Sequence, residues 1–239
     1  MSVDPAPPPP PSRFDASGWS DASSRETLQL IAESVAQMVG FEVAVISAVQ
    51  GDLLVKVAIE GTDDVRRTLE GMRTPMRNIH DELAVAADWG RFKFVDHELV
   101  DLDDEYRWIP DLSPVSAPDA WHPLDAVLAP LYTEDGELCG LLSIDLPLSG
   151  RRPDPTQLGL LERYAAQAER ALRNALEREA LGHRLRLAEA ARQVVRFAVS
   201  QTDVEEALDE CRPALLEGFR ADELSIRTYG GDLVGAGGS

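Results

Sequence analysis

The chain has 239 residues, of which 44% are hydrophobic, and a formal net charge of −19. Its length allows one full domain and part of another, and its acidity disfavours nucleic-acid or anionic-membrane partners, whose phosphates attract basic residues. The two cysteines, Cys139 and Cys211, lie far apart and indicate no disulfide framework. No apolar stretch reaches the roughly 20 residues of a membrane helix, so we expect no membrane partner. The two separated cysteines fit a reducing cytosol, and we expect a cytoplasmic protein.

The first elements predict an α+β fold with an antiparallel sheet. Residues 1–22 contain "PAPPPPP" and little that can be buried, which predicts a disordered tail. From Ser24, apolar residues recur at helical spacing until Gly40, which predicts a helix. "FEVAVISAV" and "LLVKVAIEG" follow as two strands joined by "QGD", the pattern of a β-hairpin.

Residues 61–120 are the least regular part of the chain. "DDVRRTLEGM" predicts a short helix, and "DELAVAADWGRFKFVDHE" predicts another helix reaching Trp89 and a strand around Phe92 to Val95. The rest reads as a long loop rich in Asp and Pro. Such a long connection within a compact domain is usually functional or mobile.

A second apolar hairpin spans residues 125–147. In its return strand, strict alternation places one set of residues on one face, namely Leu138, Gly140, Leu142, Ile144 and Leu146. It places a more polar set on the other, namely Cys139, Leu141, Ser143 and Asp145. We expect helices on the first face and the wall of a small cavity on the second. Asp145 is either a capping acid at the strand end or a polar group of that cavity.

A long helical tract follows Pro155. Its apolar series begins Leu158, Leu161, Ala165, Leu172 and resumes at Leu181 and Leu185, with a change of phase between Leu176 and Leu181. This spacing predicts a coiled-coil-like linker over residues 156–200. We expect it to join two copies in a homodimer, with the earlier part of the series as the seam.

The chain also contains an internal repeat. "GFEVAVISAVQGDLLV" at 40–55 is echoed by "GFRADELSIRTYGGDLV" at 218–234. We therefore expect one whole domain over residues 23–155 and the beginning of a second, incomplete one over 201–239, since fewer than about 40 residues rarely sustain a core alone.

The stretch "DAVLAPLYTEDGELCGLLSIDLPLSGRRPDPTQLGLLERYAAQAERAL" resembles the end of a GAF domain. The whole order of elements resembles a tandem GAF sensor region with a truncated second copy, similar to the sensor parts of actinobacterial signalling proteins. The resemblance implies a GAF-like antiparallel sheet flanked by helices, with a long C-terminal signalling helix. It also implies a regulatory sensor that passes its signal to an output domain, such as a diguanylate cyclase or a kinase, absent from this chain.

The resemblance leaves the ligand unknown. The segment "NIHDE" at 78–82 only faintly resembles the motif of GAF domains that bind cyclic nucleotides. A haem group would need His97 or His122 as its ligand. The sequence supports neither cyclic nucleotide nor haem. The acidic stretch 95–105 lacks the glycine-pinned spacing of a calcium loop, so no metal is expected. No nucleotide, hydrolase or zinc-protease motif occurs, so we expect no enzyme in this chain.

The candidate ligand site combines aromatic and polar residues of the irregular middle with two residues of the sheet. They are Trp89, Phe92, Phe94, His97, Trp108, Trp121 and His122, with Ser143 and Asp145. Aromatic walls with few polar groups are typical of small-molecule pockets. The alternative is that these aromatics only close the core, in which case the chain is a constitutive dimerisation module with no ligand.

Overall fold

The computed structural model describes residues 22–99, 106, 108–200, 212, 216, 226–227 and 233–234, with the backbone alone for 194–200, 226–227 and 233–234. The chain divides into two units, one over residues 14–176 and the other over 1–13 with 177–239. The tail predicted over 1–22 lies outside the described residues except for Ala22. The acidic loop at 100–105 and Cys211 also lie outside them.

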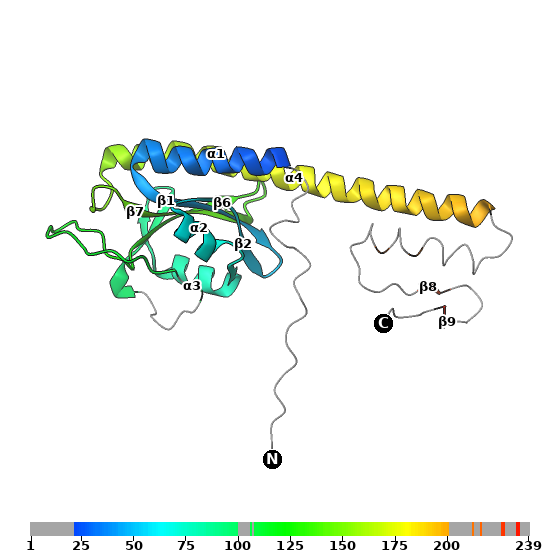
Figure 1. Ribbon diagram of the computed structural model, residues 1–239, viewed down its shortest axis with the longest axis horizontal. Coiled ribbons are helices and arrows are strands. Elements are labelled where there is room, and N and C mark those ends of the chain that lie inside the picture. Colours follow the sequence, from blue (N-terminus) through cyan, green and yellow to red (C-terminus); the bar gives the residue numbers. More distant parts are fainter. Residues whose placement is uncertain are drawn as a thin grey trace, which may run out of the picture. The chain divides into compact units, whose positions relative to one another are not determined.

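The larger unit contains a seven-stranded antiparallel sheet in the order β3-β2-β1-β7-β6-β5-β4. Its strands are β1 (Phe41–Gln50), β2 (Leu53–Glu60), β3 (Arg73–Pro75), β4 (Ala87–Trp89), β5 (Phe92–Val95), β6 (Ala126–Tyr132) and β7 (Leu138–Pro147). Its helices are α1 (Ala22–Val39), α2 (Asp63–Leu69), α3 (Met76–Val85), the 3-10 turn η2 (His97–Leu99) and the first part of α4 (Pro155–Ser200). Figure 1 shows α1 and this part of α4 above the sheet, and α2 and α3 below it. The predicted α+β fold is confirmed.

One face of the sheet is sealed by the two long helices. α1 buries an apolar stripe, and Gly40, with a φ of 87° and an N–H that donates to the Ala36 carbonyl at 3.0 Å, ends the helix as predicted. The α4 residues in this core recur every three or four positions: Leu161, Ala165, Ala168, Leu172 and Ala175, all at most 1% exposed. Spacing of this kind places them on one helix face against the sheet.

The opposite face carries two smaller apolar clusters. The α2 cluster joins Val43 and Val45 of β1 to Val65 and Leu69 of α2. The α3 cluster contains Leu54, Ile79, Val95, Leu128 and Leu141. Between them the sheet face is left partly uncovered, and this gap becomes the candidate site.

The alternation predicted for the return strand holds in its centre and fails at both ends. Leu142 and Ile144 pack under the helices, as expected. Cys139 joins them because an irregularity in the β6–β7 register, between Leu131 and Tyr132, shifts the strand by one residue. Leu146 instead joins the α2 cluster, and its φ of 55° is the left-handed conformation that breaks a two-residue repeat.

A second correction concerns the residues before Trp89. We predicted a helix reaching this residue, but α3 ends at Val85 and Ala87–Trp89 form β4, which pairs with β5. Trp89 lies directly opposite Phe92, and the tight connection between them has Gly90 at a φ of 67°. The glycine turn and the aromatic pairing outweigh the local helical composition.

The seam predicted for α4 is wrong in its earlier part. Leu161, Ala165 and Leu172 are at most 1% exposed because they fill the core of their own domain, so they cannot meet a second chain. Beyond Leu176 the same helix continues without interruption to Ser200, and there Leu181 and Leu185 are 57% and 68% exposed. The change of phase seen in the sequence marks the end of the core-facing stripe.

Little of the predicted second copy falls on described residues. Besides Arg212 and Leu216, they include two short strands, β8 (Ile226–Arg227) and β9 (Leu233–Val234), which pair antiparallel. These strands lie within the echoed segment 218–234. The remainder of the prediction for 201–239 lies outside the described residues.

The close contact between β7 and α4 gives a sharp test of the packing. A Cβ on Gly140 would lie 2.2 Å from Leu172 Cδ2 and 2.4 Å from the Ser47 carbonyl oxygen. Gly140→Ala should therefore lower the free energy of unfolding by about 1–3 kcal/mol through overpacking. The matched control is Gly159→Ala on α4, where a Cβ meets nothing within 4 Å and helix propensity should add up to about 1 kcal/mol. Urea unfolding that ranked the two variants in the opposite order would contradict this packing.

Candidate functional site

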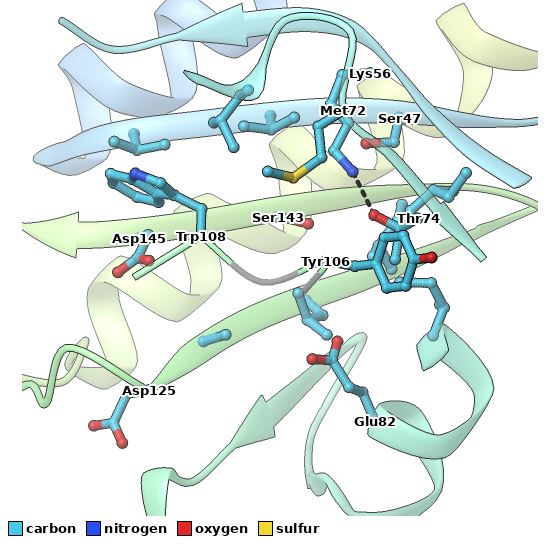
Figure 2. A pocket seen from close by; sticks show the side chains of 18 of the residues that line it. Ser47, Lys56, Met72, Thr74, Glu82, Tyr106, Trp108, Asp125, Ser143 and Asp145 are labelled. Atoms are coloured by element: carbon cyan, nitrogen blue, oxygen red, sulfur yellow. Dashed lines mark hydrogen bonds between the residues drawn. The ribbon is translucent and has the colours of Figure 1, made fainter. Parts of the chain in front are cut away.

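A cavity of about 140 Å³ lies on the sheet between the α2 and α3 clusters. Its floor is made by alternate residues of the central strands, and its walls come from α2, α3 and the irregular segment around Trp108 (Figure 2). The lining residues are Val43, Val45, Ser47, Leu54, Lys56, Leu69, Met72, Thr74, Ile79, Glu82, Tyr106, Trp108, Pro123, Asp125, Ala126, Leu128, Leu141, Ser143 and Asp145. The lining is thus mainly apolar with a few polar groups, the composition of a small-molecule pocket.

One end of the cavity gathers hydroxyl groups around an amine. The Lys56 Nζ donates to Thr74 Oγ1 at 2.6 Å, and Ser47 lies directly opposite Lys56 in the β1–β2 pair. Figure 2 shows these three side chains together at one end. Burial lowers the pKa of Lys56 from 10.5 to about 8, because an ammonium group loses hydration in apolar surroundings.

The other end of the cavity contains Trp108 and Asp145 (Figure 2). Asp145 Oδ1 accepts hydrogen bonds from Trp121 Nε1 at 2.9 Å and from the Leu146 backbone N–H at 2.6 Å. The two predicted alternatives for Asp145 are therefore both met, since its carboxylate lines the cavity and also holds the end of β7.

Asp125 closes the cavity beside Pro123 and ties three segments together. It is 1% exposed, and its oxygens accept from the backbone N–H groups of His97 and His122, both at 3.1 Å. They also contact His97 Nδ1 at 2.9 Å and Arg152 Nε at 3.3 Å. A buried carboxylate with this many donors is a structural anchor, and here it fixes the loops that wall the cavity.

The two predicted histidines stack on each other beside this anchor, with ring centroids 4.0 Å apart. One ligand atom each of Asp96, His97 and Asp125 lies within 4.8 Å of the others, a spacing that a cation could bridge. Arg152 already contacts both carboxylates. Partial burial opposes ionisation of Asp96, but the Glu98 N–H and Arg152 outweigh it and lower its pKa.

Four of the predicted aromatic residues lie in the core under the helices instead of along the cavity. Phe92 and Trp121 are fully buried, and Trp89 stacks on Phe94 with centroids 4.3 Å apart. Trp121 also meets Phe94 edge-on. For these four residues the alternative reading, that they close the core, describes the observed packing.

The structure therefore brings only part of the predicted set to one place. Trp108, Ser143 and Asp145 line the cavity, whereas His97 and His122 lie behind Asp125 at its edge. Cys139 faces α4 on the other side of the sheet, where burial first and Glu169 second raise its pKa. A protonated, buried thiol is a poor nucleophile.

Sequence reasoning missed the polar end of the cavity, which comprises Ser47, Lys56 and Thr74. One signal was available in the strand "LLVKVAIE", because Lys56 interrupts a run of apolar residues in the middle of a sheet. A lysine at such a position costs stability unless it has a partner or a function. Thr74 gave no signal, since β3 is three residues long and forms only through its pairing with β2.

Residues 23–172 match the GAF domain family, while no curated protein matches the chain significantly in sequence. The bacteriophytochrome RpBphP3 from R. palustris superposes with a TM-score of 0.57 at 13% identity, covering 92% of this chain and 47% of its own. The photosensory core module of Stigmatella aurantiaca phytochrome gives 0.54 at 18% identity with the same coverages. The chain thus spans about half the length of these two structures.

Proposed function

The chain belongs to the GAF domain family, and from this premise we propose that it is the sensor region of a signal-transduction protein. A small molecule binds in the cavity on the sheet, and α4 carries the signal towards an output domain. GAF domains are regulatory and non-catalytic modules, so any catalytic activity would belong to another part of a longer parent protein. The two separated cysteines favour a cytoplasmic location.

The observation that carries this proposal is the double role of β7. Leu141, Ser143 and Asp145 line the cavity, while Gly140 and Leu142 on the same strand lie on the helix side. Gly140 is so close to Leu172 of α4 that even a methyl group would not fit between them. Because packed interfaces tolerate little deformation, a ligand that shifts β7 must also shift the surface of the sheet on which α4 packs.

The same reasoning assigns a role to the exposed part of α4. We propose that Leu181 and Leu185, one helical turn apart on that helix, meet their counterparts in a second chain. The homodimer then transmits the shift of α4 as a change in the pairing of two helices.

The dimer can be tested by charge insertion. Leu181→Glu combined with Leu185→Glu should convert the protein from dimer to monomer in sedimentation equilibrium, because like charges would face each other across the seam. The control pair is Leu30→Glu with Met38→Glu, which alters two apolar residues of α1 that are 62% and 68% exposed. A dimer that survived the α4 change but dissociated with the α1 change would refute dimerisation through α4.

Ligand binding can be tested without knowing the ligand. Native mass spectrometry of protein purified from its own host should reveal a small adduct that denaturation releases. Ser143→Leu fills the cavity floor and should abolish the adduct, whereas Ser149→Leu, on an exposed turn, should retain it. Wild-type protein with no adduct would favour the alternative of a constitutive dimerisation module.

A further inference from the structure

We propose that the cavity binds a small organic carboxylate of about ten non-hydrogen atoms, whose carboxylate pairs with Lys56 and whose apolar body lies on the floor of β1 and β7. This inference rests on the proposed function and names its ligand class. If the cavity bound neutral molecules instead, this inference would be wrong and the proposed function would still stand.

The first observation is that Lys56 has no carboxylate partner within the part of the chain that the structure describes. Among the described residues its Nζ has one hydrogen-bond partner, the neutral hydroxyl of Thr74. The other lysine of the chain, Lys93, pairs with Asp88 at the edge of the sheet. A largely buried ammonium without a counter-charge is destabilising, and a bound anion would supply the missing charge.

The second observation is a pair of hydroxyl groups near this amine that line the cavity. Ser47 is 1% exposed and lines the cavity, as does Ser143 on β7. Within the part of the chain that the structure describes, neither hydroxyl has a hydrogen-bond partner. Both side chains line the cavity, and each hydroxyl can donate one hydrogen bond to an anionic oxygen of a bound molecule.

The number of positive charges favours a carboxylate over a phosphate. Lys56 is the only basic side chain among the described residues that line the cavity. Phosphate sites in proteins usually combine several backbone N–H groups or arginines. One ammonium group with neighbouring hydroxyl donors instead matches a carboxylate, whose single negative charge is shared by two oxygens.

The size of the cavity and its remaining lining residues determine the size and polarity of the rest of the ligand. A water molecule needs about 10–15 Å³ of such space, so a cavity of about 140 Å³ holds on the order of ten non-hydrogen atoms. Val45 and Leu141 provide an apolar floor next to the serines. Three acids also line the cavity, namely Glu82 of α3, Asp125 and Asp145. Asp125 and Asp145 lie at the far end from Lys56 (Figure 2), where the first contacts Arg152 and the second accepts from Trp121.

The test uses benzoate as the probe and benzamide as its neutral counterpart, with affinities measured by isothermal titration calorimetry at pH 7. Wild-type protein should bind benzoate at least tenfold more tightly than benzamide. Lys56→Met should weaken benzoate binding about 10- to 100-fold, the expected effect of losing a charge-assisted hydrogen bond. It should weaken benzamide binding less, by about 2- to 10-fold, because the amide carbonyl is a neutral acceptor. Lys93→Met is the matched control and should bind both probes as the wild type does.

Two results would overturn the inference while leaving the sensor proposal intact. One is equal affinity of wild-type protein for benzoate and benzamide. The other is benzoate binding that Lys56→Met does not weaken. Absence of benzoate binding to wild-type protein would also overturn the inference, and the host-purified adduct would then still decide whether the cavity holds a ligand.

Discussion

The pairing of β1 with β7 at the centre of the sheet is the contact on which the other features depend. On one face these strands are covered by α1 and α4. On the other face they form the floor of the cavity, which lies between the α2 and α3 clusters. The helix side is packed so closely that Gly140 has no room for a side chain. The cavity side contains serines and a lysine instead of a continuous apolar layer. One face thus provides stability, and the other provides space and polar groups at some cost in stability.

The sequence was sufficient for the parts of the fold that follow local rules. Both hairpins, α1 with its terminal glycine, and the helix after Pro155 agree with their alternation, caps and spacing. The errors occur where pairing overrides local pattern, as in β4, at the register shift beside Cys139 and at Leu146 with its left-handed backbone. A single sequence does not show which residue of a strand is displaced, because the displacement depends on the partner strand.

The candidate site was predicted in part for a similar reason. Ser143 and Asp145 were found from strand alternation, and Trp108 from its place in the long loop. The other aromatics were assigned to a cavity because size and polarity alone do not distinguish an aromatic wall from an aromatic core. The apolar series of α4 was misread likewise, since Leu161 and Leu172 have the spacing of a coiled coil yet pack on their own sheet. The signal at Lys56 was missed, although the cost of a lysine within an apolar strand is a physical reason to look for a ligand.

The most direct test of this account is the pH dependence of stability for wild-type protein and Lys56→Met. The pKa of Lys56 falls from 10.5 to about 8 in the folded state, so between these values the unfolded chain binds the extra proton and wild-type stability rises with pH. At pH 7 the methionine variant should be more stable by about 1–3 kcal/mol, since partial solvent contact and Thr74 reduce the full cost of the buried charge. This advantage should shrink as the pH rises from 8 towards 10.5. Two results would contradict the claim that Lys56 lowers the stability of the fold and serves a function. One is a methionine variant that is less stable than wild type at pH 7, and the other is a stability difference between the two proteins that does not change with pH.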